Sequence, residues 1–253
     1  MSELADYDKK RYHRQTLIPG LGESGQKKLK NSKVFIAGAG GLGSPAAIYS
    51  AVAGIGNIKI VDRDVVELSN LNRQILHWDK NIGQAKVESA SEKLIQINPH
   101  INVEVFKETI DESNVLELTR DSDLIIDATD NFPTRYLLNG AAIVHRIPLI
   151  HAAVYGLEGR ITAIVPGKTP CLRCIFAAAP PPEVFPILGA TAGVVALLEV
   201  TEALKILLGI GKPLLNRLLI YDGEQMKFEE IAIKRNPDCK TCGKNGTHSK
   251  YLR

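Results

Sequence analysis

A glycine-rich loop between a predicted strand and a predicted helix constrains this chain more than any other feature of its sequence. The apolar run Lys33–Ala37 leads directly into the loop, and a helical pattern begins at Ser44. Between them stand Gly38, Ala39, Gly40, Gly41, Leu42 and Gly43, which match G-x-G-x-x-G. Such glycines allow a tight turn and a close approach of backbone to phosphate, and the first N–H groups of the helix attract an anion. The sequence therefore predicts that a nucleotide binds where this helix begins.

An acidic residue ends the second predicted strand, Ile58–Asp62. Asp62 follows the glycine loop by about twenty residues, where a carboxylate can bond a ribose hydroxyl. An NAD-dependent dehydrogenase would carry the same loop and the same acid. These features predict a nucleotide without choosing which one, and a glycine turn that binds nothing is the remaining interpretation.

The first half of the chain alternates short apolar runs with helical patterns. The predicted strands are Lys33–Ala37, Ile58–Asp62, Val103–Phe106, Leu124–Asp127 and Pro148–Ala153. The predicted helices are Ser44–Ala53, Gln84–Ile97, Asp111–Arg120 and Pro133–His145. This alternation is typical of a parallel sheet with helices on both faces. We therefore predict an α/β fold with a Rossmann-like, mostly parallel sheet.

The second half of the chain has a different pattern. A long apolar helix is predicted at about Thr191–Leu208, and the predicted strands are Arg160–Val165, Leu218–Tyr221 and Met226–Ile233. Four prolines between positions 180 and 186 indicate a loop, because proline blocks helix and ladder hydrogen bonds. We expect one domain over residues 1–253. It would have a nucleotide-binding core at about 30–150 and, at about 151–253, a β-containing extension that binds a partner.

Polar side chains follow the predicted strands at the points where the strands end. Beyond the second strand stand Asp64, Ser69, Asn70, Arg73 and Gln74. Lys86 lies early in the next helix, and Asp130 and Asn131 follow the fourth strand. Because ligands of open α/β sheets bind beyond the carboxyl ends of the strands, we expect these side chains to converge on one site.

The two cations and the acid favour a triphosphate over a dinucleotide. Arg73 and Lys86 can neutralise charge on transferring phosphorus and on leaving pyrophosphate. Asp130 can hold Mg²⁺, which prefers carboxylate and phosphate oxygens. A hydride-transfer site would instead need a proton donor beside a carbonyl, and the sequence names none. Taken singly, Arg73 could be a solvated charge and Asp130 a helix cap, so the prediction rests on the set.

Four cysteines form two C-x-x-C pairs, Cys171 with Cys174 and Cys239 with Cys242. This repeated spacing is typical of a tetrahedral Zn²⁺ site, with free thiols or redox pairs as the alternative. Four protein ligands would close the site, which makes it structural. It would tie the C-terminal segment to the chain that leaves the nucleotide core.

Charge and hydropathy exclude several classes of protein. The chain has 31 Lys and Arg against 28 Asp and Glu, and this net charge of +3 is too small to indicate DNA binding. The charged first thirty residues argue against a secretory signal, and no apolar run reaches the length of a membrane span. We expect a cytoplasmic protein that does not associate with a membrane. For none of the six histidines, including His77 and His151, can a catalytic partner be identified from the sequence, so none is assigned a role.

Together these motifs resemble those of the ubiquitin-activating superfamily. The chain is most similar to its MoeB/ThiF/HesA adenylyltransferases, over nearly its whole length. The resemblance implies ATP and magnesium, a homodimer, and a small ubiquitin-like sulfur-carrier protein with a Gly-Gly C-terminus as substrate. It implies that Arg73 and Lys86 bind the phosphates, that Asn70 assists, and that Asp130 holds magnesium. It also implies that Arg14 reaches into the neighbouring subunit's site.

One departure from the family bears on the chemistry. ThiF-like relatives keep a further cysteine before an Ala-Gly pair, whereas residues 187–193 here contain none. If all four thiolates bind zinc, we expect the enzyme to stop at the acyl-adenylate while a separate sulfurtransferase supplies sulfur. The sequence does not decide which carrier is the substrate: molybdopterin biosynthesis, thiamin biosynthesis, tRNA thiolation and protein tagging all stay open. So do adenylation of a peptide or a tRNA base, an NAD-dependent oxidoreductase, and the inert half of a heterodimeric activating enzyme.

Overall fold

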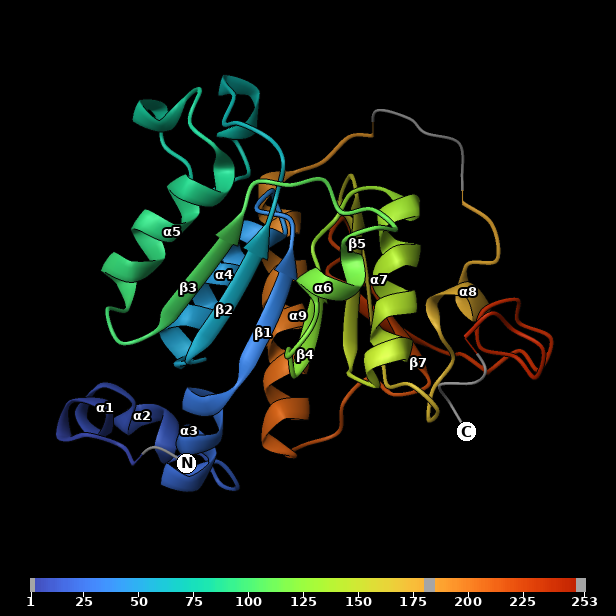
Figure 1. Ribbon diagram of the computed structural model, residues 1–253, viewed down its shortest axis with the longest axis horizontal. Helices are drawn as coiled ribbons and strands as arrows, with labels where there is room; N and C mark the ends of the chain where they lie inside the picture. Colours follow the sequence, from blue (N-terminus) through green and yellow to red (C-terminus); the bar gives the residue numbers. More distant parts are fainter. Residues whose placement is uncertain (1–2, 180–184, 249–253) are drawn as a thin grey trace.

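The computed structural model describes residues 3–179 and 185–248 (Figure 1). The proline-rich loop predicted at 180–186 therefore lies mostly outside the described residues. Phe185 and Pro186 are described and belong to no helix or strand. The carbonyl of Pro186 accepts a hydrogen bond from the backbone N–H of Gly156, so this end of the loop lies against the sheet.

One mixed sheet organises the described chain. Its strands are β1 (Lys33–Ala37), β2 (Asn57–Val61), β3 (Asn102–Phe106), β4 (Leu124–Asp127), β5 (Leu149–Tyr155), β6 (Glu158–Ile164), β7 (Arg217–Asp222) and β8 (Lys227–Ala232). Their spatial order is β3-β2-β1-β4-β5-β6-β7-β8. The first five strands in this order, β3 to β5, pair in parallel with their neighbours. Strands β6, β7 and β8 continue the sheet in antiparallel pairs. The predicted mostly parallel sheet is thus confirmed, and the C-terminal strands prolong the same sheet.

Helices cover both faces of this sheet. They are α1 (Asp6–Arg11), α2 (His13–Thr16), α3 (Gly22–Asn31), α4 (Gly43–Ala53), α5 (Lys86–Ile97), α6 (Val115–Leu118), α7 (Phe132–His145), α8 (Leu172–Ile175) and α9 (Gly189–Leu208). Residues of α4, α5 and α9 pack in one apolar cluster, and residues of α6, α7 and α8 pack in the other. The short helices α1–α3, which the sequence did not predict, lie together at the amino-terminal end of the strands (Figure 1).

The central strand β1 shows why the sheet is buried on both sides. Val34 and Ile36 belong to the cluster formed with α4, α5 and α9, whereas Phe35 and Ala37 belong to the opposite cluster. Successive side chains of a strand point to opposite faces, so a strand covered on both sides needs a continuous apolar run. This requirement explains the unbroken apolar sequence that precedes the glycine loop.

One predicted helix is much shorter than expected. Residues Asp111–Arg120 were predicted as helix, but α6 contains only Val115–Leu118. The carboxylate of Asp111 accepts hydrogen bonds from the backbone and the hydroxyl of Ser113, and the side chain of Asn114 accepts from the Asp111 N–H. Short polar side chains compete for backbone groups in this way and favour a turn over a helix.

No helix in the described ranges is both long enough and apolar enough to cross a membrane. The longest one, α9, spans 20 residues and carries Glu199, Glu202 and Lys205. It packs against α4 and the middle of the sheet instead.

Candidate functional site

A cavity of about 560 Å³ opens beyond the carboxyl ends of β1, β2 and β4. Eleven of the residues predicted to bind the nucleotide line it: Gly38, Gly40, Gly41, Leu42, Asp62, Asp64, Arg73, Gln74, Lys86, Asp130 and Asn131. Segments far apart in the sequence meet here because the strands that precede them are parallel neighbours. The side chains expected to converge are therefore found around one cavity.

The glycine loop needs glycine at particular positions. Gly38 has φ of 101°, which side chains disfavour, and a Cβ there would lie 2.8 Å from the Ala128 carbonyl oxygen. A Cβ on Gly43 would collide with the Gly38 carbonyl, so Gly43 allows close packing inside the loop while it lies outside the cavity lining. The loop is therefore compact and presents backbone to the cavity.

Asp62 holds the loop as well as facing the cavity. Its carboxylate accepts hydrogen bonds from the backbone N–H groups of Ala39, at 2.8 Å, and Asp64, at 2.9 Å. Burial raises the pKa of Asp62, although these hydrogen bonds and the charge of Lys86 oppose the shift. One carboxylate oxygen thus fixes the glycine loop from the neighbouring strand, in addition to any bond with a ribose.

The two predicted cations reach the cavity from different elements. Lys86 begins α5, its side chain is 7% exposed, and its Nζ lies 3.0 Å from Asp64 Oδ2. Arg73 follows a short 3-10 helix, Leu68–Asn70, and its guanidinium donates to the carbonyl of Ser69 at 2.9 Å. Because its hydrogen bonds within the described residues go to Ser69 and Asn72 of its own loop, Arg73 can turn toward a phosphate at small cost. The cavity wall also holds Gln74, whose Oε1 is buried without a hydrogen-bond partner.

Asp130 is exposed and free of the capping role that the sequence left open. The side chain of Asn131 caps α7 instead, by accepting from the Thr134 N–H at 3.0 Å. Among the described residues, Asp130 accepts one weak hydrogen bond, from the Asn131 amide at 3.4 Å. Asp130 lines the cavity and its carboxylate is accessible, which fits Mg²⁺, because this ion binds through one or two carboxylates together with substrate phosphates.

Three other predicted residues lie outside the cavity lining. Ser69 is exposed, and Asn70 is buried with its Oδ1 accepting from the Glu67 N–H at 3.1 Å. Asn70 therefore holds the loop that carries Arg73. Arg14 is exposed on α2, at the opposite end of the strands from the cavity (Figure 1). Within one chain, Arg14 and the cavity are not brought together.

The structure adds a buried polar cluster that the sequence analysis missed. Asp127 and His151 face each other on paired strands, and His151 Nδ1 lies 2.8 Å from Asp127 Oδ2. Burial alone would raise the pKa of Asp127, but the hydrogen bond from His151 and the charge of Arg135 outweigh it and lower the pKa. Burial lowers the pKa of His151. A neutral ring therefore donates to an ionised carboxylate.

Arg135 connects this cluster to the cavity. It lies on α7, donates to the Thr129 carbonyl at 2.7 Å, and has its Nε 3.9 Å from Asp127 Oδ2. Arg135 lines the first cavity and also a second one of about 460 Å³. The second cavity continues past Asp130 toward Tyr155 and Phe176. The two cavities share Arg135, so a ligand in each would meet at this cation.

Glu199 on α9 is fully buried beside the same cluster. Burial raises its pKa well above the usual value, and the charge of Asp127 adds to the shift, while Arg135 opposes it. The folded chain therefore keeps a proton that the unfolded chain releases above about pH 4.3. The stability from this neutral carboxyl is complete below that pH and is lost as the pH rises through the raised pKa.

The variant Glu199→Gln keeps the shape and cannot ionise. Wild-type unfolding free energy should fall by up to about 1.4 kcal/mol per pH unit between about pH 4.3 and the raised pKa, and the variant should lack this slope. Urea denaturation at pH 5 and pH 8 measures both. Glu112→Gln, at an exposed position, is the matched control. Equal pH dependence of the wild type and Glu199→Gln would contradict the prediction.

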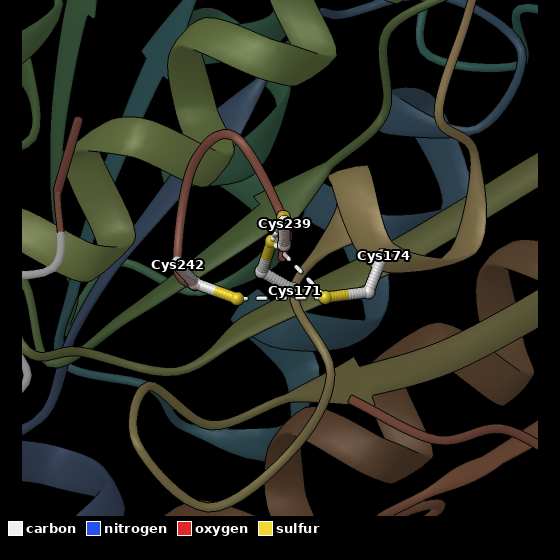
Figure 2. Close-up of side chains that lie close together, drawn as sticks. All are labelled: Cys171, Cys174, Cys239 and Cys242. Atoms are coloured by element: carbon white, nitrogen blue, oxygen red, sulfur yellow. Dashed lines mark hydrogen bonds between the residues drawn. The ribbon is translucent and has the colours of Figure 1, made fainter. Parts of the chain in front are cut away.

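The four cysteines meet beside α8, and Figure 2 shows their side chains pointing toward one another. All four sulfurs lie within 4.8 Å of each other, with Cys171 Sγ 3.7 Å from Cys239 Sγ and Cys174 Sγ 3.4 Å from Cys242 Sγ. A tetrahedron with Zn–S bonds of about 2.3 Å has edges of about 3.8 Å. The cluster thus has the dimensions of a four-thiolate metal site, and it is the one such group in the part of the chain that the structure describes.

Fold and cavity together define a nucleotide-binding α/β protein whose site combines a glycine loop with Arg73, Lys86 and Asp130. A family model described as the ThiF family matches residues 12–241. The chain therefore belongs to the ThiF family, as the resemblance in the sequence implies.

Named relatives agree with this membership. The SAMP-activating enzyme E1 of Haloferax volcanii is 45% identical over 245 residues, covering 94% of this chain and 90% of that protein. The sulfur carrier protein adenylyltransferase of Thermus thermophilus is 42% identical over 253 residues, covering 96% and 93%. Among solved structures, E. coli MccB with ATP has a TM-score of 0.83 at 26% identity, covering 95% of this chain and 76% of that one. MccB with N-formylated MccA has a TM-score of 0.85, also at 26% identity, with coverage of 95% and 77%.

Proposed function

We propose that this chain is an ATP-dependent adenylyltransferase that activates the C-terminal carboxylate of a small ubiquitin-like sulfur carrier and releases pyrophosphate. The observation that carries the proposal is that Arg73, Lys86 and Asp130 line the same cavity as the glycine loop. Two relatives of nearly full-length coverage are named for sulfur-carrier adenylation or SAMP activation, which supports the same reaction.

The reaction asks this chain mainly to position two anions. The carrier's carboxylate is already a nucleophile at neutral pH and attacks the α-phosphorus of ATP, while the bond to pyrophosphate breaks. Arg73 and Lys86 stabilise the charge that builds on the transferring and leaving phosphates. The backbone at the start of α4 binds phosphate oxygens through its N–H groups. No side chain needs to form a covalent bond.

Asp130 is the residue that would hold Mg²⁺, and the ion would supply charge neutralisation between the phosphates. Asn131 keeps α7 in place by capping it, which leaves the Asp130 carboxylate available. The carrier's flexible Gly-Gly end would enter through the second cavity, because that cavity meets the first at Asp130 and Arg135. Arg135 would then orient the carboxylate that attacks.

The active assembly is a homodimer in this proposal. Arg14 lies far from the cavity of its own chain, so it can act only in the site of a second copy. An exposed arginine on a short helix is suited to such a crossing because it has no bond to its own site. The carboxyl side of the chain, from about residue 151, would bind the carrier.

We assign the cysteine cluster to Zn²⁺ with a structural role. All four thiols are used by the cluster, and the chain has no further cysteine to accept an acyl group. The enzyme therefore stops at the acyl-adenylate, and a separate sulfurtransferase delivers sulfur. Reduced thiols agree with the cytoplasm as its compartment.

Exchange of label between pyrophosphate and ATP tests the proposal. We expect exchange to appear only when a Gly-Gly-ended carrier is added, and to disappear when the carrier lacks its last two glycines. Intact-protein mass spectrometry should show no covalent adduct between the carrier and this chain. Exchange without any carrier would contradict the proposed substrate, and a thiol-sensitive adduct would contradict the acyl-adenylate as the last step.

A peptide substrate is the second candidate, and one comparison favours it. The structural neighbour MccB is described with MccA bound, at 26% identity. The relatives named for carrier chemistry share 42% and 45% identity with this chain, which favours the carrier. An NAD-dependent oxidoreductase or an inert partner subunit would not need Arg73, Lys86 and Asp130 around one cavity. Thermal shifts with ATP and with NAD separate these classes.

A further inference from the structure

A buried histidine holds the glycine loop from the side opposite Asp62. His77 is 3% exposed, and its Nε2 lies 2.9 Å from the carbonyl oxygen of Ala39, inside the loop. A carbonyl oxygen can only accept, so Nε2 carries the proton. The other ring nitrogen, Nδ1, lies 3.0 Å from the hydroxyl of Ser89 on α5 and accepts from it. When the ring is neutral, these two contacts define a single tautomer.

The chain of hydrogen bonds from Ala39 through His77 to Ser89 continues along α5 to the buried ammonium group of Lys93. Lys93 Nζ donates to the Ser89 hydroxyl at 2.7 Å, to the Ser89 carbonyl at 3.1 Å and to Asn81 Oδ1 at 2.7 Å. These contacts use all three Lys93 donors, and they leave the Ser89 hydroxyl proton directed at His77. Burial, together with the charge of Lys93, lowers the pKa of His77 to about 4. The ring therefore stays neutral throughout the physiological range.

Hydrogen bonds hold the two peptide units on either side of Ala39. The Ala39 N–H donates to Asp62 at 2.8 Å, and the Ala39 carbonyl accepts from His77 at 2.9 Å and from the Ser44 hydroxyl at 3.3 Å. In a planar trans peptide the N–H points opposite to the C=O, so the Gly40 N–H is directed away from His77. Gly40 lines the cavity, and among the described residues its N–H has no protein acceptor. The N–H is therefore available to a phosphate oxygen.

We infer that His77 is a positioning residue for ATP, which orients the peptide between Ala39 and Gly40 so that the Gly40 N–H binds phosphate. The inference rests on the proposed function, because it takes the nucleotide in the glycine loop to be ATP. His77 itself touches no substrate. Its effect should therefore appear in the affinity for nucleotide and not in the affinity for the carrier.

Three variants separate positioning from general packing. His77→Leu fills the space and cannot donate, so it should raise the Kd of ATP about tenfold or more. His77→Gln places an amide nitrogen near the position of Nε2 and should restore the Kd to within about threefold of the wild type. Ser89→Ala removes the hydroxyl that donates to His77 Nδ1, with little change in volume. It should weaken ATP binding by a factor between those of the two His77 variants. Isothermal titration with ATP measures all three.

Steady-state kinetics separate an effect on ATP binding from an effect on carrier binding. In pyrophosphate exchange, His77→Leu should raise the KM for ATP and leave the KM for the carrier within twofold. Thr119→Val, which removes a buried hydroxyl at the C-cap of α6, away from the loop, should leave both KM values unchanged. If folded His77→Leu or folded Ser89→Ala binds ATP as tightly as the wild type does, the role of His77 is refuted, while the proposed function still stands. Failure of the wild type to bind ATP would overturn the proposed function as well.

Discussion

Arg73→Ala is expected to lower the rate of carrier-dependent pyrophosphate exchange by about 10²–10³-fold. Arg73 lines the cavity beside Gly41, and a Cβ on Gly41 would lie 3.5 Å from Arg73 Cδ. Its hydrogen bonds go to Ser69 and Asn72 of its own loop, so the fold should be unaffected. Exchange rates at saturating ATP and carrier measure the loss.

The matched control is Arg120→Ala, which removes an exposed arginine whose only ion pair in the described chain is with Glu117. It should keep full exchange activity. Lys86→Ala and Asp130→Ala should fall to a similar level as Arg73→Ala, since each contributes charge around the same phosphates. Full activity in all three site variants would refute the site assignment, even if the family assignment holds.

Loss of a cysteine ligand is expected to have the largest effect on stability. Cys239→Ser should reduce bound zinc well below one ion per chain and lower the Tm by at least about 10 °C. A structural Zn²⁺ contributes about 10–16 kcal/mol in zinc-finger peptides, and each 1 kcal/mol shifts the Tm of a domain this size by about 2–4 °C. Metal analysis of the purified protein and calorimetry measure the two quantities.

Asp238→Asn is the control for this prediction, because Asp238 is exposed, adjacent to Cys239, and offers no sulfur to the cluster. It should bind zinc and melt as the wild type does. A wild-type protein that contains no metal would refute the zinc assignment. Unchanged melting of a metal-free Cys239→Ser would show that the cluster does not hold the C-terminal segment.

The local parts of the site were predictable because each carries its signal in a few adjacent residues. The glycine loop, Asp62 and Lys86 are all placed by where a strand ends or a helix begins, and β1 and β4 have the predicted bounds. The cysteine pairs were predictable for the same reason, since C-x-x-C is a local spacing. Parallel strand order then brought these signals to one edge.

The parts that were missed depend on strand register and on helix orientation. Asp127 and His151 are 24 positions apart and become partners only when β4 pairs with β5 in one register. His77 acts through Ala39 and Ser89, neither of which is adjacent to it in the sequence. Arg135 lies one turn into α7, where a cation gives no pattern of its own. Partners of this kind are set by tertiary packing, which a single sequence does not encode locally.

The cysteine cluster also bears on the order in which the chain folds. It joins Cys171 to Cys239, 68 positions apart, and the segment between them contains α9, β7 and β8. Closing a loop of this length costs an unfolded chain roughly 4 kcal/mol of conformational entropy. If the chain binds its metal early, this loop closes before α9 packs on the sheet. The strands β7 and β8 then have fewer conformations to search before they pair. Refolding with metal present should therefore be faster than refolding with metal added afterwards.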